Sequence, residues 1–467
     1  MNLLRDLGIL LGPGGFIVEP DTMAPYLIDW RKLYAGRAIG VARPRDTAEV
    51  AAVLRLAASA GVATVPQAGN TGLVGGGIPL AEGRSLVLSL ERMNRIRAID
   101  PANYTITVEA GCILQHVQQA AEEVDRLFPL SLTAEGSCRI GGNLSTNAGG
   151  IAVLHYGNMR DLALGIEVVL PDGQSWDGLR ALRKDNTGYD LKHLFIGAEG
   201  TLGVITAAVL KLFPRPRERV TIFAAAADLP ATLVLLARLR SASGDALTSF
   251  ELIPRISLAL ALEYVAGSFD PFAAPHEHYL LIELSSSRES GGLRAAAEAA
   301  LAVALDDGLL LDATIAESEA QARRLWFLRE AIVEAQRPAG AGIKHDVAVP
   351  VAAVPDFLSE ATAAVTAALP GVRVLAFGHL GDGNIHFNLC QPRQMAAAEF
   401  LARTGAFNRL VHDIVARHGG SISAEHGLGQ LRREEIRRYK PAVEMDLMRR
   451  IKAALDPQGL MNPGKLL

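Results

Sequence analysis

Glycine is concentrated at a few points of this 467-residue chain, and the first cluster follows directly after a predicted strand at residues 63–66. The loop that comes next, residues 66–79, holds five glycines. Glycine allows positive φ angles and close backbone approach, so that successive N–H groups can converge on an anion such as a pyrophosphate. The spacing is not that of the Rossmann dinucleotide fingerprint, and no helical pattern follows. A ligand-binding loop and a long surface turn both stay open, and the apolar residues between the glycines favour the former.

Two further glycine clusters lie in the same half of the chain. In residues 136–150, glycine alternates with small hydroxyl and amide side chains, and Lys and Arg are almost absent. A large neutral or weakly anionic ligand therefore fits this cluster better than a triphosphate does. Residues 196–206 enter a predicted strand through more glycine, which a β-bulge or a tight turn would explain equally well.

Length and apolar content predict two or three domains, because 467 residues with 49% apolar side chains exceed one ordinary core. Predicted helices and strands alternate up to residues 214–217, where two prolines break the pattern. Runs of strands and helices follow without regular alternation, which indicates an α+β fold with an antiparallel sheet. We expect domains at residues 1–216 and 217–417 and a C-terminal helical segment at residues 418–467, with single helices at 396–417 and 441–455.

Charge and cysteine content narrow the class of protein. The formal net charge is −4 without blocks of like charge, which argues against nucleic acid or an anionic membrane as the main partner. Three cysteines provide no disulfide framework. No signal peptide and no apolar stretch long enough to span a bilayer is evident, so we expect a soluble, cytoplasmic protein. The oligomeric state is left open, with a homodimer as one option.

A hairpin is predicted around residues 379–388, where a strand ending at Phe377, a glycine turn and a strand beginning at Ile385 bring His386 back towards His379. In the second strand, alternation places Ile385 and Phe387 on an apolar face and His386 and Asn388 on a polar face. Taken singly, each histidine is better explained as an ordinary hydrogen-bonded residue than as a metal ligand.

Glu425 and His426 set a carboxylate beside an imidazole, between a predicted helix and a glycine turn. Two histidines and one glutamate with an open coordination position suit zinc or a similar ion. If this segment is extended, the side chains of Glu425 and His426 point to opposite sides.

In this order and spacing, the three glycine clusters resemble the FAD-binding domain of the vanillyl-alcohol oxidase / p-cresol methylhydroxylase superfamily. From about residue 34 to the end, the chain resembles its D-2-hydroxyacid dehydrogenase branch, most specifically in residues 143–150, 182–191 and 462–465. The resemblance implies a two-part FAD-binding domain, an antiparallel-sheet substrate (cap) domain and a C-terminal segment that packs back on the FAD domain. Relatives with covalent flavin often carry a histidine where this chain has Asn70, so we expect non-covalent FAD. The cofactor-binding residues that the resemblance implies are Pro66, Gly69, Asn70, Thr71, Gly72, Leu73, Gly75, Gly76, Thr133, Gly136, Ser137, Gly142, Asn143, Ser145, Asn147, Gly149, Gly150, Glu199, Gly200, Ile205 and Asn462.

The same resemblance implies a metal site and a substrate site. It makes His379, His386 and Glu425 the ligands of a divalent metal, zinc as the first expectation, and His426 the active-site base. The substrate-binding residues that it implies are Arg329, on a helix, and Lys344, on a following strand, both for carboxylate charge, together with Asn388 and Val333. Val333 stands where some hydroxyglutarate-type relatives have threonine, which puts recognition of a second, distal carboxylate in doubt.

The implied activity is oxidation of a D-2-hydroxy acid to the 2-oxo acid, with the hydride passing to flavin N5. D-2-hydroxyglutarate is the first expectation, and D-lactate, D-malate and D-mandelate are alternatives. Electrons then pass to an unidentified acceptor, for which an electron-transfer flavoprotein, a quinone and a cytochrome all stay open. Two other classes compete, namely a zinc hydrolase built on the His/His/Glu site and a non-catalytic flavoprotein or binding module.

Overall fold

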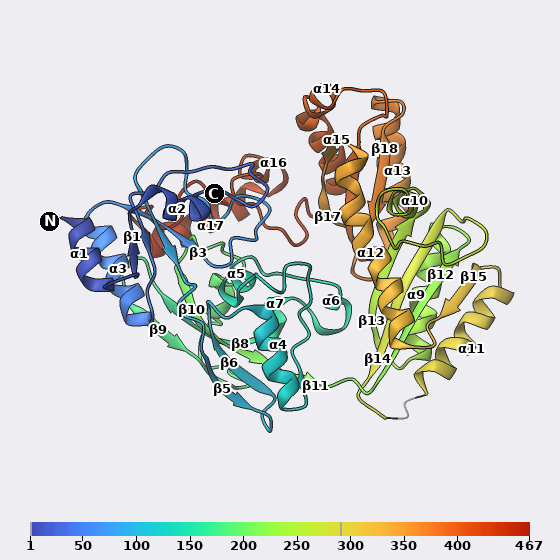
Figure 1. Cartoon of the computed structure of the whole chain (residues 1–467), viewed down its shortest axis with the longest axis horizontal. Helices are drawn as coiled ribbons and strands as arrows, with labels where there is room; N and C mark the ends of the chain where they lie inside the picture. Colours follow the sequence, from blue (N-terminus) through green and yellow to red (C-terminus); the bar gives the residue numbers. More distant parts are fainter. Residues whose placement is uncertain (1, 290–291) are drawn as a thin grey trace. The chain divides into compact units, whose positions relative to one another are not determined.

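The computed structural model describes residues 2–289 and 292–467 (Figure 1). The chain divides into two compact units. Unit 1 contains residues 1–150, 156–215 and 425–467, and unit 2 contains residues 151–155 and 216–424. The sequence places these breaks after residues 216 and 417. Mixed helices and antiparallel sheets confirm the predicted α+β class.

The first sheet of unit 1 has the strand order β1-β2-β4-β3, in which β2 and β3 both run parallel to β4. A helix between β2 and β3 makes this parallel crossover possible. That helix, α3, begins where the Asp46 side chain accepts a hydrogen bond from the Glu49 N–H, and it buries Val50, Val53 and Leu54 against the sheet. The elements are α1 (Leu3–Leu11), β1 (Phe16–Ile17), α2 (Pro20–Leu27), β2 (Val41–Ala42), α3 (Thr47–Ser59), β3 (Ala63–Gln67) and β4 (Ser85–Ser89).

The second sheet of unit 1 is antiparallel, in the order β5-β6-β10-β8-β9. Its inward residues, such as Ile106, Val108 and Ala208, pack with helices α4 and α5 in one core. The elements of this part of the chain are β5 (Ile96–Asp100), β6 (Thr105–Glu109), α4 (Leu114–Glu123), β7 (Arg126–Leu127), α5 (Ile140–Ser145), α6 (Val153–Tyr156), α7 (Met159–Leu162), β8 (Ala163–Val169), β9 (Ser175–Gly178), α8 (Lys192–Phe195), β10 (Val204–Lys211) and β11 (Phe213–Pro214). Strands β7 and β11 pair in a separate two-stranded sheet, and α6 lies mostly in unit 2.

The C-terminal segment of unit 1, red in Figure 1, returns to the first sheet. Met461 pairs with Thr64 of β3 in parallel, and the Asn462 N–H donates to the Thr64 carbonyl oxygen at 2.8 Å. The chain end therefore lies beside the strand that leads into the glycine loop. The helices of this segment are α16 (Ile436–Tyr439) and α17 (Ala442–Leu455).

The larger sheet of unit 2 has the order β13-β14-β12-β15 and is antiparallel. Successive residues of β12 point to opposite faces of the sheet and pack in two different cores. Ile222 and Ala224 pack with α9 and α11. Phe223 and Ala225 pack with α10 and α12. The elements are β12 (Glu218–Ala226), α9 (Leu229–Ala242), β13 (Leu247–Pro254), α10 (Arg255–Tyr264), β14 (His278–Ser286), α11 (Leu293–Asp306), β15 (Leu310–Ile315) and α12 (Glu319–Ala339).

The smaller sheet of unit 2 is built on β19, which pairs with β16, β17 and β18. Residues 396–417 are predicted as one helix, but they form two, α14 and α15, with a break at residues 402–403. None of the helices in the described ranges is long and apolar enough to cross a membrane. The elements are β16 (Gly342–Ile343), β17 (Asp346–Ala348), η1 (Val351–Ala353), α13 (Val354–Ala368), β18 (Arg373–Phe377), η2 (Leu380–Asp382), β19 (Asn384–Cys390), α14 (Ala397–Leu401) and α15 (Thr404–Arg417).

Lys465, near the chain end, is 2% exposed, and its Nζ donates to the Pro463 carbonyl oxygen at 3.3 Å. Burial lowers the pKa of this amine to about 8. At pH values between about 8 and 10.5, this lysine binds more protons in the unfolded chain than in the folded protein. Its contribution to the free energy of unfolding therefore rises with pH. We expect Lys465→Met to be more stable than the parent at pH 7 by up to ~3 kcal/mol, with the difference shrinking towards pH 10. Urea unfolding of both proteins across this range checks the sign, and a difference that grows with pH contradicts it.

Candidate active site

The three glycine clusters meet in one pocket of unit 1. The loop after β3, helix α5 and the residues that lead into β10 line it, and His426 from the C-terminal segment joins them. The pocket holds about 960 Å³ of space free of protein atoms, including solvent at its open side. The predicted cofactor-binding residues in its lining are Pro66, Gly69, Asn70, Thr71, Gly72, Gly75, Gly76, Gly142, Asn143, Ser145, Glu199, Gly200 and Ile205.

The other predicted cofactor-binding residues lie outside this lining, and several have a visible role in packing. A Cβ atom at Gly150 would lie 2.0 Å from the Ser131 carbonyl oxygen, so the fold itself requires glycine there. Asn462 lies behind the pocket, where its Nδ2 donates to the carbonyl oxygens of Gly76 at 3.0 Å and Glu199 at 2.7 Å. Their contacts with FAD stay predictions. The full set is Leu73, Thr133, Gly136, Ser137, Asn147, Gly149, Gly150 and Asn462.

The lining residues fit a large ligand with many hydrogen-bonding edges. A Cβ atom at Gly72 would meet no protein atom within 4 Å, so packing does not explain the glycine at this position. The buried Asn143 Oδ1 has no hydrogen-bond partner among the described residues. An open glycine face and an unsatisfied acceptor are the features expected where a ligand completes the structure.

We expect Gly72→Ala to weaken FAD binding by about tenfold or more, because the added methyl group occupies ligand space, at a cost typical of overpacking. The melting temperature of the apoprotein should not fall, since the methyl group meets no protein atom. Gly405→Ala is the matched control, because a Cβ atom there, near the start of α15, also meets nothing within 4 Å. Titration of FAD against the three apoproteins checks this, and parent-like affinity in Gly72→Ala contradicts it.

Glu199 connects this pocket to the segment that carries His426. Its carboxylate is 8% exposed and accepts hydrogen bonds from the backbone N–H groups of Leu428 and Gly429, both at 2.8 Å. Burial raises the pKa of Glu199, and these two hydrogen bonds offset only part of the rise. Gly427, with φ +78°, leaves room for the carboxylate, since a Cβ atom there would lie 2.9 Å from Oε1. Glu199 therefore fixes the backbone just after His426.

The predicted histidine hairpin is confirmed in unit 2. Strands β18 and β19 pair with Phe377 opposite His386, and His379 follows the first strand. Ile385 and Phe387 lie in the core, as their face predicts. The ring centroids of His379 and His386 are 5.6 Å apart.

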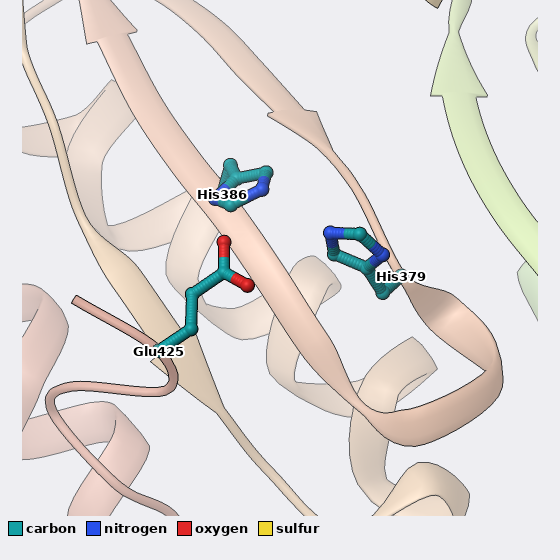
Figure 2. Close-up of side chains that lie close together, drawn as sticks. All are labelled: His379, His386 and Glu425. Carbon is teal, nitrogen blue, oxygen red and sulfur yellow. The ribbon is translucent and has the colours of Figure 1, made fainter. Parts of the chain in front are cut away.

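Glu425 follows directly on Ala424, the last residue of unit 2, whose N–H donates to the Asp346 carbonyl oxygen at 3.1 Å. Figure 2 shows its carboxylate turned towards the two imidazoles, and one ligand atom from each of His379, His386 and Glu425 lies within 4.8 Å of the others. Nitrogen and carboxylate donors in this number fit a zinc-type ion. A second group with ligand atoms within 4.8 Å of one another consists of Asp346, Glu425 and His426. The sequence did not predict Asp346 as a site residue.

The segment around Glu425 is bent, not extended. The extended conformation would separate the two side chains, but Glu425 Oε1 lies 3.7 Å from His426 Nε2. The close approach is a local consequence of the bend at residues 424–426.

The predicted substrate-binding residues of unit 2 differ in exposure. Arg329 on α12 is only 8% exposed, so it does not extend into solvent as a surface arginine would. Asn388 is also buried, and its Nδ2 donates to Gln336 Oε1 at 2.9 Å. Val333, one turn after Arg329, is exposed. Lys344 is exposed and lies between β16 and β17, not on a strand as predicted.

Comparison with known proteins identifies the family. Residues 215–466 match the model of the FAD linked oxidases, C-terminal domain, and residues 38–177 match the FAD binding domain. A D-2-hydroxyglutarate dehydrogenase of Xanthomonas citri pv. viticola is 40% identical over 456 residues, which cover 96% of this chain and 93% of that protein. The probable mitochondrial D-2-hydroxyglutarate dehydrogenase of Oryza sativa subsp. japonica is 40% identical and covers 98% and 80%. This chain belongs to the FAD-linked D-2-hydroxyacid dehydrogenases.

Solved structures agree with this family at the level of fold. A p-cresol methylhydroxylase matches with a TM-score of 0.78 at 15% identity, covering 99% of this chain and 96% of the other. An alkyldihydroxyacetonephosphate synthase matches with a TM-score of 0.74 at 17% identity, covering 99% and 84%. The predicted family, fold and FAD-dependent oxidoreductase class are thus confirmed. Membership of this oxidoreductase family argues against the zinc hydrolase and the non-catalytic alternatives.

Proposed function

We propose that this dehydrogenase oxidises D-2-hydroxyglutarate to the 2-oxo acid with FAD and a divalent metal. The observation that carries the proposal is the near full-length similarity to proteins named D-2-hydroxyglutarate dehydrogenase. The His379, His386 and Glu425 group supports the metal, and the buried guanidinium of Arg329 supports an anionic substrate.

When bound, FAD accepts the two electrons of the oxidation, and a zinc-type ion supplies Lewis acidity at the substrate oxygens. His426, held in the pocket lining of unit 1, takes the proton of the substrate hydroxyl group at an imidazole nitrogen. Arg329 and Lys344 hold carboxylate charge and orient the substrate. Backbone N–H groups of the glycine loop bind the FAD pyrophosphate.

A smaller substrate is the second candidate, and Val333 favours it. The exposed valine offers no hydrogen bond for a distal carboxylate. D-lactate, which has a methyl group in that position, needs none. D-malate and D-mandelate are further candidates.

A dye-reduction screen of the purified protein tests the proposal. D-2-hydroxyglutarate, D-lactate, D-malate, D-mandelate and L-2-hydroxyglutarate are compared, each with and without chelator and with Zn²⁺ or Mn²⁺ added back. We expect the highest kcat/KM with D-2-hydroxyglutarate and loss of activity in the chelator. Preference for D-lactate selects the second candidate, whereas reaction with the L-enantiomer alone overturns both.

The electron acceptor is also a proposal, for which an electron-transfer flavoprotein, a quinone and a cytochrome are retained. A relative from Saccharomyces cerevisiae, 34% identical, is named D-2-hydroxyglutarate–pyruvate transhydrogenase. Pyruvate therefore belongs among the acceptors assayed. The cytoplasmic location and the homodimer remain predictions.

A further inference from the structure

A buried carboxylate in unit 2 lies between two predicted site residues that are far apart in the sequence. Glu251 on β13 is 0% exposed. Its Oε2 lies 2.6 Å from Arg329 Nε, and its Oε1 lies 2.8 Å from His379 Nδ1. One side chain therefore contacts both the arginine proposed to bind the substrate and a histidine proposed to bind the metal.

Backbone pairing fixes this arrangement. Leu252, next to Glu251, exchanges hydrogen bonds with Gly378, next to His379, at 2.8 and 3.1 Å. Gly378 has φ +134°, a conformation that favours glycine, and a Cβ atom there would lie 3.1 Å from the Asn384 carbonyl oxygen within the same hairpin. Glu251 and His379 are thus held together by the fold, not by side-chain flexibility.

The geometry at His379 suits a metal ligand. A carboxylate at Nδ1 favours the tautomer with the proton on that nitrogen and leaves Nε2 with its lone pair for a metal. His386 has a comparable but longer contact, since its Nδ1 lies 3.7 Å from Asp346 Oδ1. Glu251 gives the shorter and more buried contact of the two.

The geometry at Arg329 suits a carboxylate site. Glu251 binds Nε, and the guanidinium lies 4.8 Å from the centre of the Phe377 ring. No hydrogen bond joins its two terminal nitrogens to another of the described residues. Those nitrogens are therefore available for the end-on, bidentate pairing that carboxylates form with arginine.

We propose that Glu251 is a positioning residue that links the metal-binding His379 to the substrate-binding Arg329, so that loss of this one carboxylate weakens both metal and substrate binding. The inference rests on the proposed function for the roles of these two residues. It adds that metal affinity depends on a residue outside the His/His/Glu group.

The test compares Glu251→Gln with Glu283→Gln. Glu283 is a matched control because it lies on the neighbouring strand β14, where its Oε2 accepts a hydrogen bond from Trp326 Nε1 at 3.0 Å. Zn²⁺ affinity is measured by competition with a chromophoric chelator, without substrate. We expect Glu251→Gln to lose about 10- to 100-fold in Zn²⁺ affinity, as for other carboxylates behind metal-binding histidines, and Glu283→Gln to match the parent.

The substrate half of the proposal is tested by steady-state kinetics with saturating Zn²⁺. We expect Glu251→Gln to raise KM for D-2-hydroxyglutarate by about tenfold, the size of one charge-assisted hydrogen bond. The visible spectrum of the Co²⁺-substituted protein should also change, because the histidine at the metal is reoriented. Retention of the flavin shows that the variant is folded, so unfolding does not explain such a spectral change.

Parent-like Zn²⁺ affinity in a folded Glu251→Gln protein overturns the proposal. If that variant does not fold, Glu251→Asp replaces it, because one methylene less cannot maintain both contacts, and the same outcomes apply. The metal readout needs no turnover. Absence of D-2-hydroxyglutarate oxidation in the parent would therefore contradict the proposed function without deciding this inference.

Discussion

His426→Asn is expected to lower kcat for D-2-hydroxyglutarate oxidation by about 10²- to 10⁴-fold, the usual contribution of a general base. Asparagine keeps a polar side chain of similar reach but takes up no proton. Because proton uptake matters in the transition state, KM should change little. Glu199 holds the neighbouring backbone, so the variant should keep its fold and flavin.

The measurement is dye reduction at saturating substrate, normalised to bound flavin. His193→Asn is the control, since this histidine of unit 1 has a 44% exposed side chain and lies outside the pocket lining. Added imidazole should restore part of the activity of His426→Asn and have no effect on the control. Undiminished kcat in the variant would assign the base to another residue.

The second large effect is expected from metal removal. We expect a chelator to lower kcat/KM by about 10²-fold or more, since Lewis-acid stabilisation is worth several kcal/mol. Stoichiometric Zn²⁺ should restore the activity of the parent, whereas His386→Ala should have low activity before and after the addition. Elemental analysis of the same samples links activity to bound metal.

His418→Ala provides the comparison for His386→Ala, because His418 lies in unit 2 and its Nε2 contacts Glu360 at 2.8 Å. His418→Ala should have the same activity as the parent before chelation, after chelation and after the addition of Zn²⁺. Full activity in a sample that elemental analysis finds free of divalent metal would exclude a metal role, while leaving the flavin assignment intact.

Local patterns were sufficient for the hairpin and the glycine loop. In β19, period-two alternation correctly separates the apolar face of Ile385 from the polar face of His386. The loop after β3 is predicted as a candidate ligand loop from five glycines in 14 residues, and the structure places it in the pocket lining. Such features depend on neighbours in the sequence.

The parts that sequence reasoning missed depend on tertiary contacts. Strand β13 mixes buried Thr248, Ser249 and Glu251 with apolar residues, so it shows no clear alternation. Helix α10, which follows it, is apolar throughout residues 258–262, so periodicity does not distinguish it from a buried strand. Glu251 was therefore not recognisable as a site residue until the fold placed it 2.8 Å from His379. Asp346 was missed for the same reason.

The pairing of Met461 with Thr64 has a consequence for the order of synthesis. The ribosome synthesises residues 1–215 first, then residues 216–424 of unit 2, and only afterwards residues 425–467, which complete unit 1. Unit 1 therefore cannot form the Met461–Thr64 pairing or place His426 in the pocket lining until residues 216–424 have been synthesised. A stop codon after residue 424 would remove both the Met461–Thr64 pairing and His426 from unit 1, so we expect the truncated protein to be purified without flavin, which its visible spectrum checks.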